Sequence, residues 1–323
     1  MKRFASPAEA RAAGLRRTAV TLGVFDGVHV GHRYVIEQTN RLARERGGAS
    51  VVVTFARHPR GVVDGTPPQL ITSLPHRLRL FEQLGVDAVL TLDFDAAMRD
   101  TSPEDFARGI FHDALRADVV LLGWNGRFGK GGRGGFETLQ RVGREFGFEA
   151  RQAEQLMLGG EAVSSTAIRA AVLVGDLDRA ARMLGRPVSV LGRVVEGDGR
   201  GRTLGWPTAN LDLLHEVRPP RGVYGAEVED GDLRRFALVN IGVRPTFKPP
   251  DGGLSSLPAS WESRDRDDVI EVHLLDFTGD LYGRELEVRF LKRIRDERRF
   301  GGKAELLARL DEDRREFEAF LRG

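Results

Sequence analysis

The chain has 323 residues, which at the usual domain size predicts two domains. It contains no cysteine, so disulfides, thiolate catalysis, zinc sites with cysteine ligands and iron–sulfur clusters are excluded. Lysine plus arginine number 49 and aspartate plus glutamate 47, for a formal net charge of +2, and the two signs are interleaved along the chain. This pattern favours a mixed, solvated surface over a face that binds nucleic acid.

Hydrophobic runs are short throughout the sequence. None approaches the ~18–20 residues that cross a bilayer, and the apolar stretch near the N-terminus ends at Asp26, too early for a signal peptide. We therefore expect a cytoplasmic protein with no membrane partner. The 39 glycines exceed the usual share, the surplus falls in a few clusters, and glycine clusters near strand ends often bind phosphate.

The first half of the chain alternates between strand and helix patterns. Buried strands are predicted at Ala19 to Val24, Ser50 to Phe55, Asp87 to Leu92 and Asp118 to Leu122. Helices are predicted at His32 to Arg46, from Ser73 to Leu84, after the capping residue Ser102, and from Ser165 to Leu184. The alternation predicts a doubly wound parallel α/β sheet, which binds ligands beyond the carboxyl ends of its strands.

After Pro187 the pattern changes to strands with few helices between them. Strands are predicted at Val188 to Val195, Gly222 to Glu229, Phe236 to Ile241, Val269 to Leu275 and Leu286 to Phe290. Glu229 to Asp232 is a hairpin turn signal, Lys248 to Asp267 is typical of a loop, and Lys303 to Leu321 predicts a closing helix. We expect an antiparallel sheet or small barrel here, with the domain boundary at Pro187.

One motif joins the first buried strand to the following helix, and it reads Gly23-Val24-Phe25-Asp26-Gly27-Val28-His29-Val30-Gly31-His32. Free N–H groups at a helix start attract anions, and Gly31 allows a phosphate to approach the backbone. His29 and His32 are three residues apart, so both imidazoles can converge on an α-phosphate. The alternative is two ordinary histidines, but the strand-to-helix context favours a nucleotide site.

Three further segments of the first half have two interpretations each. Val163 to Arg169 combines hydroxyls with an arginine at a helix start, which suits the β- and γ-phosphates of ATP but would also suit a plain helix cap. Thr54 to Arg60 follows the second strand and would also fit a simple strand exit. Gly129 to Gly134 fits G-x-G-x-x-G, but it does not directly follow a strand and no Ser or Thr follows Lys130, so neither a dinucleotide fingerprint nor a P-loop is predicted.

The most informative run of the second half extends from Gly197 to Leu211. Its spaced glycines can present backbone N–H groups to a polyphosphate, and Arg202 can neutralise charge. Thr208 and Asn210 share a face in an extended segment and offer hard oxygen ligands suited to Mg²⁺. The glycines alone would fit a flexible turn, whereas the complete run is far more specific for a polyphosphate and Mg²⁺ site.

Together these segments resemble the bacterial bifunctional riboflavin kinase/FAD synthetase family over essentially the whole chain. Further matching segments are Asn240 to Phe247, Ile270 to Phe277, Asp280 to Gly283 and Phe290 to Glu297. The resemblance implies a Rossmann-like FMN adenylyltransferase domain over residues 1–187. It also implies a riboflavin kinase domain over residues 188–323, built as a six-stranded antiparallel β-barrel with a closing helix. ATP would phosphorylate riboflavin to FMN and then adenylylate FMN to FAD with release of pyrophosphate, both with Mg²⁺.

The resemblance also implies roles for residues that match the motifs of the adenylyltransferase domain. His29 and His32 would be catalytic. The expected ATP-binding residues are Gly23, Phe25, Asp26, Gly31, Asn125, Ser164, Ser165, Thr166 and Arg169. The expected flavin-binding residues are Phe55, His58, Pro59 and Phe128.

In the kinase domain the resemblance makes Glu271 the general base, although from the sequence alone Glu271 could equally be an outward-facing strand residue. Thr208 and Asn210 would be the Mg²⁺ ligands. The expected ATP- and flavin-binding residues are Gly199, Gly201, Arg202, Thr203, Gly205, Pro207, Asn240 and Arg244. The expected partners are riboflavin, FMN and ATP, with no nucleic acid, and the chain is expected to be a monomer or weak homo-oligomer.

Two positions depart from the family pattern and keep an alternative open. Gly126 stands where an aromatic residue is usual, and Ala167 where arginine or another large residue is common. The alternative is a riboflavin kinase whose N-terminal domain binds nucleotide without adenylylating FMN. A rival of another class is a non-enzymatic, arginine-rich nucleic-acid-binding protein, which the dispersed charge disfavours.

Overall fold

The computed structural model describes residues 1–63, 65, 68–196, 205–214, 216–231, 233–243, 268–298 and 300–323. The expected site residues Gly199, Gly201, Arg202, Thr203 and Arg244 and the predicted loop from Lys248 to Asp267 lie outside these described residues. The chain forms two compact units. The first comprises Met1–Ile168 and Met183–Gly185, and the second Arg169–Arg182 and Arg186–Gly323.

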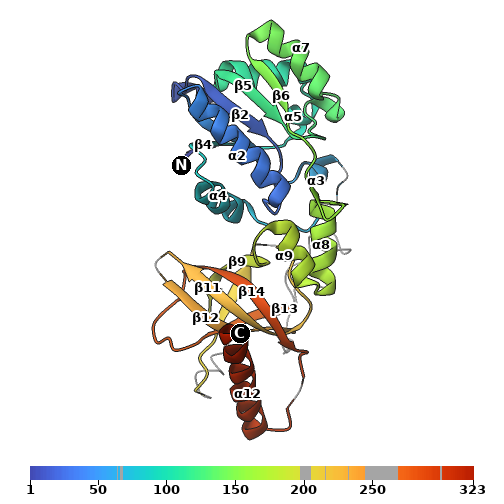
Figure 1. The fold of residues 1–323 in the computed structure, drawn as a ribbon. Coiled ribbons are helices and arrows are strands. Elements are labelled where there is room, and N and C mark those ends of the chain that lie inside the picture. The colour runs from blue at the N-terminus through green and yellow to red at the C-terminus, as the bar shows by residue number, and fades with distance from the viewer. Residues whose placement is uncertain are drawn as a thin grey trace. The chain divides into compact units, whose positions relative to one another are not determined.

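The first unit is built on a six-stranded parallel sheet (Figure 1). Its strands are β1 (Lys2–Phe4), β2 (Thr18–Leu22), β3 (Ser50–Phe55), β4 (Ala88–Leu92), β5 (Ala117–Leu122) and β6 (Glu149–Gln152), in the order β1-β4-β3-β2-β5-β6. Because the chain moves from β2 to β3 and β4 and then returns to the other side of β2 at β5, the topological switch point lies between β2 and β5. The predicted parallel sheet is confirmed, and the edge strands β1 and β6 are additions.

Helices cover both faces of this sheet, as a doubly wound fold requires. They are α1 (Pro7–Ala12), α2 (Val30–Glu45), α3 (Pro59–Val63), α4 (Leu74–Gln83), α5 (Ala96–Asp100), α6 (Pro103–Phe106), a π-helix η1 (Ala107–Ala114), a 3₁₀ turn η2 (Lys130–Gly132) and α7 (Phe136–Phe146). Val52 of β3 packs with Ile36 of α2, whereas Val51 and Val53 pack with Phe111 of η1 on the other face. Burial on both faces explains why these strands show no alternation of apolar and polar residues.

The predicted helix from Ser165 to Leu184 is instead two helices, α8 (Ser165–Val174) and α9 (Leu177–Leu184). The break comes at Gly175, whose φ of +81° is left-handed, and Asp176 then accepts a hydrogen bond from the Arg179 N–H at 3.0 Å. Gly175 ends the first helix and Asp176 caps the second, and these local signals override the continuous apolar pattern that predicted a single helix. A small hairpin, β7 (Met157–Leu158) with β8 (Glu161–Ala162), precedes α8.

The second unit contains a closed antiparallel barrel in the order β10-β13-β12-β11-β14-β9. Its strands are β9 (Ser189–Val195), β10 (Ala209–Leu213), β11 (Gly222–Asp230), β12 (Leu233–Val243), β13 (Asp268–Leu274) and β14 (Glu285–Arg295). The helix α12 (Lys303–Arg322) follows β14. The six-stranded barrel with a closing helix is confirmed.

A buried aromatic ring anchors the closing helix on the barrel. Phe317 of α12 is fully buried and packs with Leu238 of β12 and Leu275 after β13. A Cβ at Gly225 would lie 2.1 Å from Cδ2 of this ring, so only glycine lets the ring approach β11 this closely. The half-buried Trp206, which belongs to the predicted run from Gly197 to Leu211, packs against the same apolar cluster.

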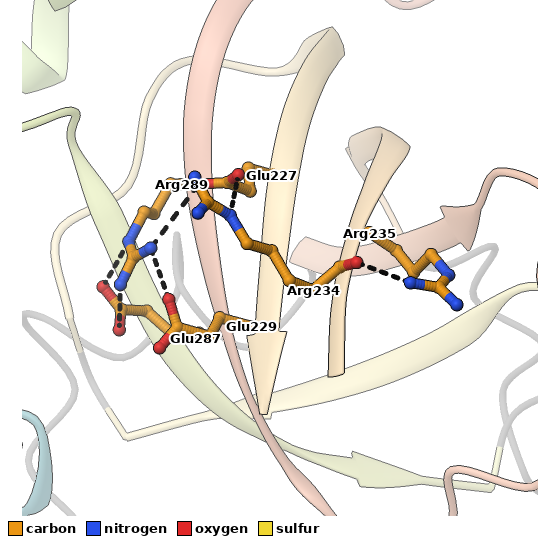
Figure 2. Close-up of polar contacts among 6 residues, drawn as sticks. All are labelled: Glu227, Glu229, Arg234, Arg235, Glu287 and Arg289. Carbon is orange, nitrogen blue, oxygen red and sulfur yellow. Dashed lines mark hydrogen bonds and ion pairs between the residues drawn. The ribbon is translucent and has the colours of Figure 1, made fainter. Parts of the chain in front are cut away.

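A cluster of charged side chains covers part of the barrel wall (Figure 2). Arg289 of β14 donates to both oxygens of the fully buried Glu287 at 3.1 Å and also contacts Glu227 and Glu229 of β11. Arg234 of β12 contacts Glu227 as well. Burial lowers the pKa of Arg289, but Glu287 and Glu229 more than offset this, so its pKa is raised and its charge ties β11 to β14.

Candidate active sites

The loop that leaves β2 adopts an unusual backbone course. Phe25 has a φ of +52°, Gly27 of +86° and Val28 of +40°, so two residues with side chains occupy the left-handed region. Their side chains are almost completely buried and pack with Ile36 and Phe81. This burial offsets the backbone cost, and the loop is therefore held in one shape before any ligand arrives. Phe25, expected to bind ATP, is a core residue beneath the loop.

The buried side chain of Asp26 anchors the same loop. Its carboxylate is 2% exposed, and its Oδ1 accepts hydrogen bonds from the N–H groups of Ile71 at 2.9 Å and Thr72 at 3.0 Å. The Thr72 hydroxyl in turn accepts a hydrogen bond from the Gly27 N–H at 2.8 Å. Asp26 therefore shapes the loop with a carboxylate that points into the protein.

The two sequence motifs expected to bind ATP meet at Asp26. The Ser165 hydroxyl donates to the Asp26 carbonyl at 2.9 Å, which brings the start of α8 to the loop after β2. Ser164 caps α8 by accepting from the Ala167 N–H at 3.2 Å, as the cap interpretation of this segment required. Thr166 is exposed in the first turn and Arg169 lies one turn further along α8.

His29 and His32 converge at the N-terminus of α2. Their rings stack with centroids 3.5 Å apart and an interplanar angle of 18°. His29 is the N-cap, and its Nδ1 accepts from the His32 N–H at 3.2 Å. When His29 is neutral, this hydrogen bond leaves its proton on Nε2, which becomes a donor. A Cβ at Gly31 would lie 3.2 Å from the His29 ring, so glycine makes room for it.

A cavity of about 530 Å³ opens at the carboxyl ends of β2 and β3. Its walls include residues of the predicted set, namely Phe55 and Phe128 from the flavin group and Gly23 from the motif after β2. Pro59, also predicted, lines it too. His58 is not among the lining residues, and its Nδ1 accepts from the Arg60 N–H at 3.2 Å. Sequence reasoning missed further apolar wall residues: Leu22, Val24, Phe94, Met98 and Phe106.

Charged side chains from two segments also line this cavity. Asp100 at the end of α5 pairs with Arg99 at 3.1 Å and with Lys130 of η2 at 3.2 Å. Hydrogen bonds from Arg99 and then Lys130 hold the pKa of Asp100 below its usual value. Lys130 belongs to the glycine-rich segment for which neither a dinucleotide fingerprint nor a P-loop was predicted. Gly129, Gly131 and Gly132 have left-handed φ values, and the turns that they form let this segment line the cavity.

A second, polar cavity of about 410 Å³ lies beyond β5 and β6. Asn125, expected to bind ATP, lines it together with Trp124, and the Gln152 side chain donates to the Trp124 carbonyl at 2.7 Å. Arg127 and Arg133 line both cavities. A Cβ at Gly126 would lie 2.6 Å from the Leu122 side chain, so the departure from the family pattern at Gly126 suits the tight loop seen in this structure.

In the barrel, three predicted residues form one row across neighbouring strands. Asn210 of β10 pairs in register with Glu271 of β13, and Glu271 pairs with Asn240 of β12. Their neighbours Ile270 and Val272 are buried in the barrel, whereas Glu271 is partly exposed, so the row faces outward. Glu271 is therefore an outward-facing residue, as one interpretation held, and it also stands beside a predicted Mg²⁺ ligand.

The segment that enters β10 contacts β13 through a histidine. The His273 Nδ1 lies 2.8 Å from the Pro207 carbonyl, and its ring centroid lies 4.4 Å from that of Trp206. Burial lowers the pKa of His273, and the hydrogen bond to Pro207 offsets this only in part. Gly205 precedes these residues with a left-handed φ of +79°. Sequence reasoning did not single out His273, and its place two residues after Glu271 on the same strand face was the available signal.

The donor atoms of the barrel site suit one kind of metal. In the described part of the chain, no group of three or more histidine, aspartate or glutamate side chains could hold an ion. Thr208 and Asn210 offer neutral oxygen atoms, which fits Mg²⁺, an ion that keeps waters and binds through phosphate oxygens.

None of the helices described has the length and apolar character needed to cross a membrane.

Comparison with known proteins gives matches over both units. A family model described as FAD synthetase matches residues 12–167, and one described as riboflavin kinase matches residues 184–321. A bifunctional riboflavin kinase/FMN adenylyltransferase from Escherichia coli is 37% identical over 297 residues, covering 91% of this chain and 90% of that protein. Its counterpart from Bacillus subtilis is 34% identical over 304 residues, covering 93% and 91%. The solved structure of a protein called macrolide-efflux protein from Streptococcus pneumoniae is 30% identical, covers 93% of each chain and has a TM-score of 0.76.

Proposed function

The chain belongs to the bifunctional riboflavin kinase/FMN adenylyltransferase family, and we propose that residues 188–323 phosphorylate riboflavin while residues 1–187 adenylylate the resulting FMN. The products are FMN and ADP in the first step, and FAD and pyrophosphate in the second. Both enzymatic domains match and the relatives carry both activities in their name, which supports the bifunctional enzyme over the kinase-only alternative.

The observation that supports the proposal is that each unit brings some of its predicted residues together. In the parallel unit, the stacked His29 and His32 stand at the N-terminus of α2. In the barrel, Asn210 and Glu271 are direct register partners. Residues 61 positions apart in the sequence become neighbours in this way, as a common site requires.

The apolar cavity of the parallel unit suits a flavin ring. Phe55 and Phe128 present aromatic surfaces, and most of the other wall is apolar. We assign the isoalloxazine ring of FMN to this cavity, with Pro59 as a further wall residue and His58 at the exit of β3. Lys130, Arg99, Arg127 and Arg133 add positive charge at the cavity, which suits a phosphorylated flavin better than a neutral one.

Adenylylation then needs no covalent enzyme intermediate. A phosphate oxygen of FMN attacks the α-phosphorus of ATP, the bond between the α- and β-phosphates breaks, and pyrophosphate leaves. His29 Nε2–H, His32 and the free N–H groups at the start of α2 would stabilise the charge that develops on the α-phosphate. Gly23, Gly31, Asn125 and the start of α8, with Ser164, Ser165, Thr166 and Arg169, remain the proposed ATP contacts.

In the barrel, Glu271 would accept the proton of the ribityl 5′-hydroxyl as its oxygen bonds to the γ-phosphorus of ATP and ADP leaves. Thr208 and Asn210 would hold Mg²⁺, which when bound screens the phosphate charge during the transfer. Asn240 belongs to the same row, and Gly205 and Pro207 lie in the segment that leads to Thr208. Gly199, Gly201, Arg202, Thr203 and Arg244 remain proposed ATP and flavin contacts from the sequence resemblance.

We further propose that the chain works in the cytoplasm, where ATP is plentiful, on riboflavin, FMN and ATP and without a nucleic-acid partner. The interleaved acidic and basic residues support the last point. We also propose that the chain is a monomer or a weak homo-oligomer.

The test is a time course with riboflavin, ATP and Mg²⁺, with the flavins separated by chromatography. FMN should appear first and FAD later. FMN that accumulates without FAD would support the kinase-only alternative, and conversion of neither riboflavin nor FMN would contradict the proposal as a whole.

A further inference from the structure

A single imidazole links the two segments of the proposed kinase site. His273 stands on β13, two residues after Glu271, and its side chain faces the same side of the strand. Its partner, the Pro207 carbonyl, lies immediately before Thr208. A carbonyl only accepts hydrogen bonds, so Nδ1 must carry the proton and donate it.

The backbone ladder between β10 and β13 stops where this contact begins. Its first register pair is Ala209 with Val272, followed by Asn210 with Glu271. Pro207 has no N–H to extend the ladder. Continued by one residue, the same register would set Thr208 opposite His273, so the side chain of His273 supplies the hydrogen bond that the backbone does not.

The imidazole is also held in place by ring packing. Trp206 packs against the imidazole, with the two ring centroids 4.4 Å apart. Trp206 also packs against the apolar cluster that includes Phe317 and Leu275. The ring is therefore fixed by packing as well as by its hydrogen bond. A donor fixed in this way can define the orientation of the peptide that leads into Thr208.

We propose that His273 is a positioning residue for riboflavin phosphorylation. By holding the Pro207 carbonyl, it orients the oxygen ligands of Thr208 and Asn210 toward the carboxylate of Glu271. This inference rests on the proposed kinase function of the barrel. His273 itself takes no part in the chemistry, and its effect passes through Pro207.

The test compares two substitutions in the full chain. His273→Phe keeps a ring against Trp206 but removes the donor, whereas His273→Asn retains an N–H near the position of Nδ1. For His273→Phe we expect kcat of riboflavin phosphorylation to fall about ten- to a hundredfold, the usual effect of losing a group that orients a metal ligand. The Mg²⁺ concentration at half-maximal rate should rise in parallel. His273→Asn should recover most of both.

Binding provides a readout besides activity. The Kd of Mg·ADP, measured by calorimetry, should weaken about tenfold in His273→Phe and change little in His273→Asn. FMN adenylylation by the same samples should equal that of the original chain. If His273→Phe does not fold, His273→Gln serves instead, because its amide reaches past the Nδ1 position.

Two results would overturn the inference: an unchanged Kd and kcat in His273→Phe, or a loss in His273→Asn as large as or larger than that in His273→Phe, which would show that the hydrogen bond to Pro207 does not carry the effect. Failure of the kinase proposal looks different. In that case the unsubstituted chain would not phosphorylate riboflavin, or Glu271→Gln would phosphorylate it at the full rate.

Discussion

The two units bring their site residues together by opposite means. In the parallel unit the residues stand at the carboxyl ends of strands, near the topological switch point between the neighbouring strands β2 and β5. In the barrel they stand within or directly beside strands, on the outward face, and register decides which ones meet. The first site therefore depends on how one loop is anchored, and the second on the alignment of three strands.

Because of this difference, different interactions hold the two sites in place. The loop after β2 is held by the buried Asp26 and by the side chains of Phe25 and Val28. The barrel register is held by backbone ladders and by ion pairs between strands, such as those of Arg289 with Glu227 and Glu229. Substitutions in one unit should therefore leave the chemistry of the other unit intact.

The largest effect is expected at the histidine pair. His29→Ala combined with His32→Ala removes two groups that would stabilise charge on the α-phosphate, and conversion of FMN to FAD should fall about 10⁴-fold. Riboflavin phosphorylation, measured by chromatography in the same sample, should continue. His112→Ala, which changes a histidine paired with Asp113 elsewhere in the unit, is the matched control. Unchanged FAD formation in the double variant would remove the His pair from the mechanism.

The second effect is expected at the proposed base of the barrel. Glu271→Gln keeps the shape of the side chain but accepts no proton, so riboflavin phosphorylation should fall about 10³-fold. FAD formation from added FMN should continue at its original rate. Glu285→Gln, at an exposed position on β14, is the control. A Glu271→Gln variant that still makes FMN rapidly would show that the base lies elsewhere.

The third effect concerns stability in the barrel. Arg289→Leu leaves the fully buried Glu287 without its bidentate partner, and the free energy of unfolding of the barrel should drop by about 3 kcal/mol. Chemical denaturation followed by circular dichroism measures this change. Arg235→Leu, which removes an arginine that donates to the neighbouring Arg234 carbonyl at 2.8 Å, should have little effect. Equal losses in both variants would contradict the role given to the Arg289 cluster.

A smaller effect is expected for the anchor of the first site. Asp26→Ala leaves the N–H groups of Ile71 and Thr72 buried without their acceptor, which costs about 2 kcal/mol of unfolding free energy. The looser loop should also slow FAD formation while FMN formation stays constant. Melting temperature and both rates, measured on one preparation, provide the check. A variant that keeps its FAD rate despite a lower melting temperature would separate the anchor from catalysis.

The local features of both units could be predicted from the sequence. Spacing alone indicated that His29 and His32 converge, because residues three apart lie on one side of a helix start. Apolar runs such as Ser50 to Phe55 indicated buried strands because each residue packs against one face or the other. These predictions required only the periods of helices and strands.

Features that depend on distant segments could not be predicted in this way. The pairing of Asn210 with Glu271 is a consequence of register, which no local pattern encodes. The edge strand β6, with the sequence Glu149-Ala150-Arg151-Gln152, is largely polar and gives no strand signal. Lys130 was visible only as part of a glycine-rich segment, because the cavity it lines is formed together with α5.

The most direct test of two separate active sites is whether two variants, each lacking one activity, make FAD together. Glu271→Gln protein and His29→Ala/His32→Ala protein are each incubated with riboflavin, ATP and Mg²⁺, and then the two are mixed. Neither alone should make FAD from riboflavin, whereas the mixture should, because FMN released by the second protein is a substrate for the first. A mixture that makes no FAD, although both proteins are folded, would contradict the assignment of the two reactions to separate and independently working sites.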